Sequence, residues 1–268
     1  MERYLIALDL DGTLLKDDKT ISPLTKQVIF RAKEAGHIVV IATGRPYRAS
    51  KMYYEELHLT TPIVNFNGAF VHHPRNDSWG IRHSPLNLET IKEIIEVSET
   101  YHIKNILAEV MDDVYFHDHD EKLLDLVKLG NPKIEIGDLR NMLKADPTSV
   151  LIHTDEQHAD ELQRYLSTVH ANVLHHRRWA APWHIIEIVR TGVHKAFGLQ
   201  QICNYFQIPQ ERVIAFGDED NDLEMIQWAG YGIAMGNAIE PLKQIANDVT
   251  KTNEEDGIAV YLKSLLKL

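Results

Sequence analysis

Short runs of hydrophobic residues alternate with helical patterns along the first part of the chain. Residues 4–8 form a continuously apolar run of strand length, which is typical of a strand buried on both faces of a parallel sheet. Ser22 and Pro23 follow as a helix N-cap and a first helical residue, and Gly36 lies where a helix C-terminal cap belongs. A second strand-like run at residues 38–42 completes a strand–helix–strand unit.

The same order of elements continues beyond this unit. Residues 43–46 turn the chain into a second helical pattern, and Asn67-Gly68 is a strong turn signal. Further strands in this buried style are expected at residues 63–66, 185–189, 213–216, 231–234 and 248–250. The repetition of strand, helix and strand predicts right-handed crossovers and an α/β fold with a doubly wound, mostly parallel, Rossmann-like core sheet.

The pattern changes character from about residue 80. A helical pattern covers residues 88–101, and shorter strand candidates then alternate with helices near residues 120–129 and 157–169. The strand candidates in this stretch are residues 103–110, 114–117, 133–136, 150–154 and 173–176. We therefore predict an α+β cap domain at residues 82–184, inserted into a core made of residues 1–81 and 185–268.

Composition and charge narrow the class of protein. The 268 residues carry 28 Lys and Arg against 39 Asp and Glu, a net charge of −11, which disfavours nucleic acid and anionic membrane surfaces as partners. Cys203 is the single cysteine, so no internal disulfide forms and a reducing compartment is expected. No apolar run reaches the ~18 residues of a membrane span. We expect a cytoplasmic protein. Composition gives no prediction of how many copies of the chain assemble.

Two carboxylates follow the first predicted strand. Asp9 and Asp11 are two residues apart, so on an extended chain they share one side at the strand's carboxyl end, where open α/β sheets bind ligands. Gly12 allows a tight turn beyond them. An Asp-Gly dipeptide alone is usually a solvated turn, but the full heptapeptide at residues 9–15 after an apolar strand is far more specific.

A second acidic loop, residues 217–222, follows the strand predicted at residues 213–216. Oxygen ligands clustered in one loop suit Mg²⁺ or Ca²⁺. A helix–loop–helix calcium site is excluded, because Leu223 and Ala229 occupy its glycine and glutamate positions. An acidic helix start explains one or two of these acids, but not four acidic positions in five.

Two more segments suit an anion. Thr43, Gly44 and Arg45 offer a hydroxyl, a close backbone approach and a helix start, although Thr-Gly before a helix is also common capping chemistry. Lys195 precedes an apolar helical pattern and offers a positive charge, although a lone lysine is normally a solvated surface group.

Together these four segments resemble the four motifs of the haloacid dehalogenase superfamily, most closely its Cof-type phosphatases. The motifs are DxDGT from Asp9, a strand-end Thr43, Lys195, and GDxxND at residues 217–222. Asn67-Gly68-Ala69 and the insertion point of the cap also agree with this group. One departure is Ala196, where family members usually have glycine after the lysine.

The resemblance implies Mg²⁺-dependent hydrolysis of a phosphate monoester through an aspartyl-phosphate. Asp9 would be the nucleophile and a metal ligand, and Asp11 the general acid and base, with its backbone carbonyl on the metal. Asp218 and Asp222 would bind or support the metal. The groups expected to hold the phosphoryl oxygens are those of Leu10, Thr43, Gly44, Lys195 and Asn221.

Substrate specificity is expected from residues outside these motifs. The candidates are Arg45, Asn67, Arg177, Arg178 and His184. The last three belong to a cationic and aromatic cluster that includes Trp179 and Trp183, for which simple packing of tryptophan rings against arginine stems is an equal alternative. The 15 histidines show no closed-site ligand spacing, so structural zinc is not expected.

The leading hypothesis is a phosphatase for small phosphorylated metabolites, either sugar phosphates or nucleotide- and cofactor-type phosphate monoesters. A phosphomutase would use the same aspartyl-phosphate but hand it to a second hydroxyl. A non-catalytic metal or phosphate sensor would need Asp9 and Asp218 but not Asp11. The phosphoacceptor domain of a two-component regulator would be about half as long and carry its acceptor aspartate on a middle strand.

Overall fold

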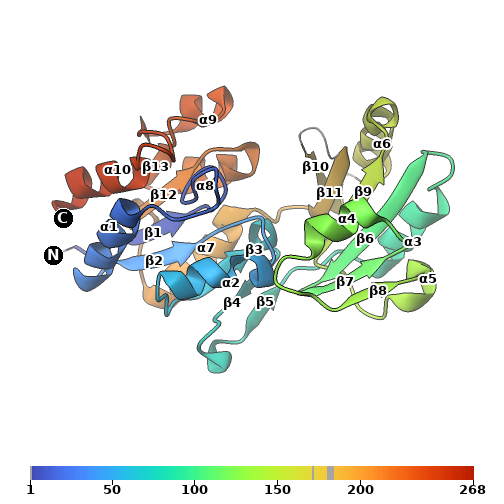
Figure 1. Cartoon of the computed structure of the whole chain (residues 1–268), viewed down its shortest axis with the longest axis horizontal. Helices are drawn as coiled ribbons and strands as arrows, with labels where there is room; N and C mark the ends of the chain where they lie inside the picture. The colour runs from blue at the N-terminus through green and yellow to red at the C-terminus, as the bar shows by residue number, and fades with distance from the viewer. Residues whose placement is uncertain (1, 171, 180–183) are drawn as a thin grey trace. The chain divides into compact units, whose positions relative to one another are not determined.

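The computed structural model describes residues 2–170, 172–179 and 184–268, and Trp183 therefore lies outside the described residues. These residues fall into two compact units (Figure 1). The first unit consists of the chain up to Arg45, Ser50–Arg82 and His194–Leu268. The second consists of Pro46–Ala49 and His83–Val193.

A five-stranded parallel sheet forms the centre of the first unit, with the order β14-β13-β12-β1-β2. Its strands are β1 (Leu5–Leu8), β2 (Ile38–Ile41), β12 (Val213–Gly217), β13 (Tyr231–Ala234) and β14 (Asp248–Val249). The three inner strands are buried along their whole length or nearly so, as their continuously apolar sequences predicted. The predicted α/β fold with a mostly parallel sheet is confirmed.

Helices cover both faces of this sheet. Leu5 and Val213 belong to a cluster on one face with residues of α7 (Lys195–Phe206) and α8 (Leu223–Trp228). On the other face the ring of Phe216 meets that of Tyr261, which lies on α10 (Gly257–Leu266). Helix α1 (Pro23–Glu34) packs beside α10. Its predicted N-cap is confirmed, because the Ser22 hydroxyl accepts a hydrogen bond from the Thr25 amide.

A small three-stranded sheet completes the first unit, with β3 (Ile63–Asn65), β4 (Phe70–His72) and β5 (Ile81–His83). The predicted turn after the third strand is the 3₁₀ segment η1 (Phe66–Gly68), which joins β3 to antiparallel β4. The remaining elements here are η2 (Asp77–Trp79), η3 (Gln210–Arg212), η4 (Asp220–Asp222), α9 (Glu240–Ile245) and most of α2 (Tyr47–Glu56), whose first residues, up to Ala49, belong to the second unit.

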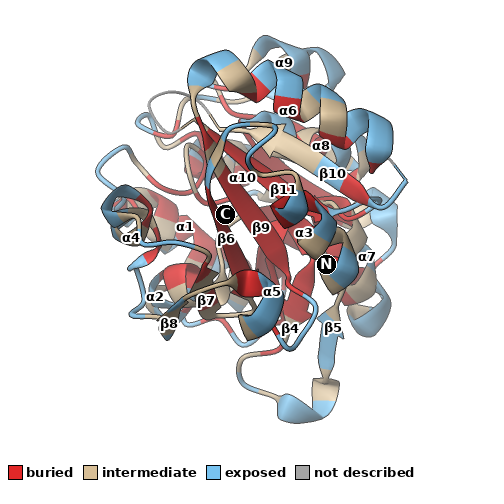
Figure 2. Ribbon diagram, turned by 90° about the vertical axis from the view of Figure 1, so that its right-hand side faces the viewer, coloured by how far each residue is buried: buried red, intermediate tan, exposed pale blue. Residues whose placement is uncertain are grey.

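The second unit is built on a six-stranded, largely antiparallel sheet with the order β10-β11-β9-β6-β7-β8. Its strands are β6 (Ile103–Val110), β7 (Asp113–Phe116), β8 (Ile134–Ile136), β9 (Ser149–Thr154), β10 (Leu174–Arg178) and β11 (Ile185–Arg190). Its helices are α3 (Leu88–Glu96), α4 (Glu121–Val127), α5 (Leu139–Met142) and α6 (Glu156–Val169). In Figure 2 strands β6 and β9 are buried, whereas exposed residues gather on the helices.

The expectation that residues 185–189 return to the parallel sheet is wrong. Strand β11 pairs antiparallel with β9 and β10 in the second unit, and the chain re-enters the first unit at His194. Ile186 and Ile188 pack into one cluster of the second unit and Ile185 into another. Apart from Glu187 the strand is apolar up to Val189, because both faces of this antiparallel sheet are covered there, and the sequence pattern does not distinguish such a strand from one in a parallel sheet.

Candidate active site

The predicted motifs meet at one edge of the parallel sheet. Asp9 follows β1, Asp218 follows the neighbouring strand β12, and Thr43 lies just beyond β2 on the other side. Because the three strands are parallel, their carboxyl ends share one edge. Lys195 is the first residue of α7, so the predicted helix begins one residue earlier than its apolar pattern.

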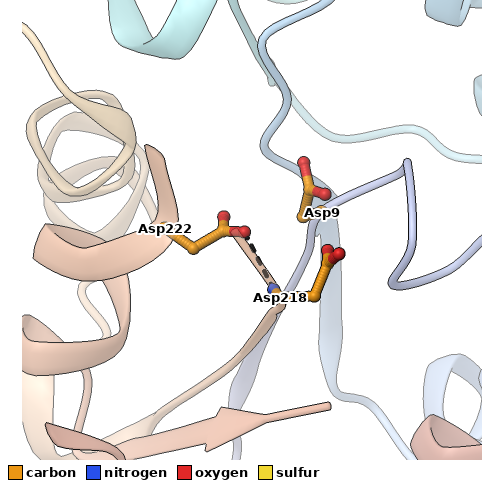
Figure 3. A group of neighbouring side chains, drawn as sticks. All are labelled: Asp9, Asp218 and Asp222. Atoms are coloured by element: carbon orange, nitrogen blue, oxygen red, sulfur yellow. Dashed lines mark hydrogen bonds between the residues drawn. The ribbon is translucent and has the colours of Figure 1, made fainter. Parts of the chain in front are cut away.

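Three buried carboxylates converge at this edge (Figure 3). Asp9, Asp218 and Asp222 each offer an oxygen, and these oxygens all lie within 4.8 Å of one another. The residues are 5%, 7% and 0% exposed, respectively. Among the described residues this is the one cluster of acids, histidines or cysteines with the spacing of a metal site.

A single lysine lies among these acids. The Lys195 ammonium donates to Asp9 Oδ1 at 2.6 Å and to Asp222 Oδ1 at 2.7 Å, and the residue is 0% exposed. Burial on its own would lower the pKa of Lys195, but the charges of Asp222 and Asp9 outweigh it and raise that pKa. Lys195 is therefore a permanent cation at this position.

One lysine does not balance three carboxylates. Burial, and then the charges of Asp222 and Asp218, raise the pKa of Asp9 well above its ordinary value in spite of Lys195. Burial, followed by the charge of Asp222, raises the pKa of Asp218 to about 7. A buried cluster of oxygen ligands with surplus negative charge fits a divalent cation.

The loop after β12 positions Asp222. Its Oδ2 accepts from the backbone N–H groups of Asp218 at 3.0 Å and Glu219 at 3.2 Å, as a helix-capping residue does. Gly217 is required at this point, because a Cβ there would lie 2.5 Å from Asp222 Cγ. The carboxylate therefore reaches both the loop backbone and Lys195.

The loop after β1 closes against Asp218. Gly12 has φ +72°, and a Cβ at this position would lie 2.1 Å from Asp218 Oδ2. The buried hydroxyl of Thr13 donates to Asp218 Oδ1 at 2.7 Å. Both residues thus hold Asp218 in place, and Thr13 is a contact that sequence analysis did not assign.

The carboxylate of Asp11 is held by two cations rather than by the acidic cluster. Arg45 donates from Nε to Oδ2 and from Nη2 to Oδ1, each at 2.6 Å, and the Lys19 ammonium donates to Oδ1 at 2.8 Å. Burial on its own would raise the pKa of Asp11, but the hydrogen bonds and charges of Arg45 and Lys19 lower it to about 2. Asp11 is an anion at neutral pH.

The predicted phosphate seat is compact. Thr43 is buried, its amide donates to Val64 O at 2.9 Å, and its hydroxyl accepts from the Arg45 amide at 3.1 Å. The Asn221 side chain donates to Asn67 Oδ1 at 2.9 Å, and a Cβ on Gly44 would lie 3.1 Å from that same oxygen. The structure thus brings Thr43, Gly44, Asn67 and Asn221 together, and Leu10 follows Asp9 in the same loop.

The remaining predicted specificity residues belong to the second unit. Arg178 donates to Asp160 of α6 at 3.1 Å, whereas Arg177 lies directly across from Glu187 on β11. The indole N–H of Trp179 donates to Glu187 at 3.0 Å. His184 precedes β11 with φ +47°. The substrate role of Arg177, Arg178 and His184 stays a prediction.

Sequence analysis missed Lys19 and Tyr53. Lys19 lies in a polar turn of ordinary appearance, so no sequence signal distinguished it from a solvated lysine. Tyr53 of α2 is buried; its hydroxyl donates to Lys19 O at 3.0 Å, and the Arg45 guanidinium lies 5.5 Å from its ring centroid. Only the folded chain brings these residues to Asp11.

Comparison with known proteins places the chain among phosphatases. Residues 6–262 match the family model described as haloacid dehalogenase-like hydrolase. The chain is 60% identical over 265 residues to the 5-amino-6-(5-phospho-D-ribitylamino)uracil phosphatase YitU of Bacillus subtilis, covering 99% of this chain and 98% of that protein. It is 30% identical over 281 residues to the pyridoxal phosphate phosphatase YbhA of Escherichia coli, covering 99% and 100%.

The fold has close counterparts among solved structures. A haloacid dehalogenase-like hydrolase from Bacteroides thetaiotaomicron superimposes with a TM-score of 0.86 at 28% identity, covering 98% of this chain and 100% of that one. Within the described residues, no helix has the length and hydropathy that crossing a membrane requires.

Proposed function

Since the chain belongs to the haloacid dehalogenase-like hydrolases and is a phosphoric monoester hydrolase, we propose that it hydrolyses small phosphorylated metabolites with Mg²⁺, through a phosphoaspartate formed on Asp9. The observation that carries this proposal is the buried cluster of Asp9, Asp218 and Asp222 around Lys195. Such a cluster is costly to fold without a further cation, and its acids lie at the ligand-binding edge of the sheet.

We propose 5-amino-6-(5-phospho-D-ribitylamino)uracil as the substrate, a cofactor-type phosphate monoester. The support is the 60% identity to a phosphatase named for this compound over 99% of the chain. Pyridoxal phosphate, for which a relative 30% identical is named, is the comparison substrate. A cytoplasmic location and the absence of nucleic-acid partners remain predictions from composition.

Asp9, Asp218 and Asp222 would hold Mg²⁺, with the backbone carbonyl of Asp11 as a further expected ligand. When bound, the ion supplies positive charge that lets a carboxylate approach an anionic phosphate. Lys195, Thr43, Gly44, Asn221 and the Leu10 amide would hold the phosphoryl oxygens.

The reaction would take two displacements. First, a carboxylate oxygen of Asp9 attacks phosphorus, the bond from phosphorus to the leaving oxygen breaks, and Asp11 gives that oxygen a proton. Water then attacks phosphorus, Asp11 takes a proton from that water, and the bond to Asp9 breaks to release phosphate. The anionic form of Asp11 held by Arg45 and Lys19 suits the second step. For the first, Asp11 must take up a proton on Oδ2, which displaces the Arg45 Nε contact while Lys19 still holds Oδ1.

The test measures phosphate release from a panel of phosphate monoesters that includes the two named above. We expect Mg²⁺-dependent release and no activity in excess chelator, and Ca²⁺ should substitute poorly because it prefers more ligands and longer bonds. Asp9→Asn should form neither phosphate nor a phosphoenzyme, because it lacks the nucleophile. Turnover in chelator would refute the metal assignment, and isomer formation without phosphate would indicate a mutase.

Asp11→Asn separates the two aspartates. This variant keeps the nucleophile but loses proton transfer, so turnover should fall by ~10²–10⁴-fold. With an activated aryl phosphate, whose leaving group scarcely needs a proton, the first step should be less impaired than the second. Wild-type activity in Asp9→Asn would exclude the covalent route.

A further inference from the structure

Lys19 lies in a short hairpin that follows the loop of Asp9 and Asp11. Leu15 bridges to Ile21, and the Lys16 amide donates to Thr20 O at 3.0 Å, so residues 15–21 fold back on themselves. The Lys19 amide closes the turn by donating to Lys16 O at 2.9 Å. The hairpin is therefore a defined structure and not a loose connection.

The backbone of Lys19 adopts a conformation that disfavours a lysine. Its φ is +64°, at the turn position where such hairpins favour glycine or asparagine. A non-glycine residue in this region is strained, and such residues cluster at functional sites. The Tyr53 hydroxyl holds this backbone by donating to Lys19 O.

The ion pair of Lys19 with Asp11 contributes little to stability. The two side chains are 55% and 43% exposed, and ion pairs this exposed add little to stability because water screens them. The stability gained from this ion pair therefore does not explain why a lysine occupies a strained backbone position. The reason is the carboxylate it contacts, because Lys19 and Arg45 together donate three hydrogen bonds to the two oxygens of Asp11.

We propose that Lys19 is a positioning residue that confines the carboxylate of Asp11 for proton transfer, with Tyr53 fixing the hairpin from which it reaches. Arg45, which lies just before α2, donates to both oxygens of Asp11, and Lys19 donates to Oδ1 from the hairpin. Donors on two separate segments restrict the Asp11 carboxylate more than donors on one segment would. This inference rests on the proposed role of Asp11.

The test is a double-mutant cycle on the first chemical step. Phosphoenzyme formation is measured in single turnovers with an alkyl phosphate, whose leaving group needs a proton, and with p-nitrophenyl phosphate, whose leaving group does not. We expect Lys19→Met to slow the alkyl reaction about tenfold and the aryl reaction much less. A small misplacement of the group that donates the proton lowers the rate strongly, and only the alkyl leaving group needs that proton. Lys19→Arg should restore most of the rate.

In an Asp11→Asn background, Lys19→Met should cause no further loss, because the proton transfer it assists is already gone. Lys16→Met is the matched control, since Lys16 lies in the same hairpin and pairs with Glu254 at 3.1 Å. Tyr53→Phe should shift the alkyl-to-aryl ratio in the same direction, and urea unfolding verifies that each variant is folded.

Two outcomes would overturn the inference. An equal loss for both esters, or an undiminished loss in the Asp11→Asn background, would mean that Lys19 acts on the substrate or on the fold directly. Effects no larger than those of Lys16→Met would leave it without a role. If Asp11→Asn itself retained wild-type rates, the proposed function would have failed instead.

Discussion

At the scale of the residue, Asp218 links protonation, metal binding and stability. Its pKa is raised to about 7 by burial and by the charge of Asp222. The folded chain thus binds this proton more tightly than the unfolded chain, whose aspartate titrates near 4. Without metal, the stabilisation is complete below about pH 4 and is lost as the pH rises through 7.

We therefore expect metal-free Asp218→Asn to be more stable than the wild type at pH 8, by ~1–3 kcal/mol, and to lose this advantage at pH 5. Mg²⁺ should reverse the order, since it binds the intact cluster better. Thermal unfolding in chelator and in Mg²⁺ at both pH values measures this, with exposed Asp248→Asn as the control. A wild type with equal metal-free stability at pH 5 and pH 8 would contradict it.

Lys195 is a second residue at which stability should depend on the bound metal. Lys195→Met leaves Asp9 and Asp222 buried without their shared cation, and breaking a buried ion pair costs about 3–5 kcal/mol. The urea midpoint in chelator should fall accordingly, and Mg²⁺ should recover more stability in the variant than in the wild type. The exposed Lys251→Met is the control, and an unchanged midpoint would show that the pair is dispensable.

At the scale of the element, α7 packs unusually close to the small sheet. A Cβ on Gly198 would lie 2.6 Å from Val64 Cγ1 and 3.1 Å from Val71 Cγ2. Alanine normally stabilises a helix interior by ~1 kcal/mol relative to glycine. Overpacking a full core costs ~1–3 kcal/mol, so the clash outweighs the propensity.

Gly198→Ala should therefore lower the free energy of unfolding by ~1–2 kcal/mol, although the same change stabilises most helices. Gln200→Ala, at an exposed position of the same helix, is the matched control and should stay within about 0.5 kcal/mol of the wild type. Denaturant unfolding of both variants decides the sign. A stabilised Gly198→Ala would mean that β3 and β4 yield to the added methyl group.

The sequence predicts some parts of the fold and of the site better than others. Strand ends that carry Asp9, Thr43 and Asp218 were predictable, because burial on both faces leaves a continuous apolar run that stops where polar groups begin. The same signal misplaced β11, since it reports burial and not the partner strand. Lys19 was unpredictable, because its contact with Asp11 depends on a turn conformation that lysine rarely adopts.

At the scale of the whole molecule, the second unit is proposed to select the part of the substrate that is not phosphate. Arg177→Ala or His184→Ala should change the ratio of kcat/KM between two natural esters more than turnover of a small aryl phosphate. Arg178→Ala should do less, because its guanidinium pairs with Asp160 on α6. Kinetics on all three esters measure this, and equal losses on each would show a structural role.

The position of β1 between β2 and β12 also determines when the molecule can fold as it is made. Leu5 pairs with Val213, so β1 can pair with β12 only after about 200 more residues have been made. This is a contact of large sequence separation. Ribosomes add ~5–20 residues per second, so for roughly 10–40 s the nascent chain exposes one edge of an apolar strand. The second unit is almost contiguous in sequence and is synthesised wholly within that interval. We therefore expect nascent chains stalled before residue 213 to carry an unpaired strand edge, a surface prone to aggregation.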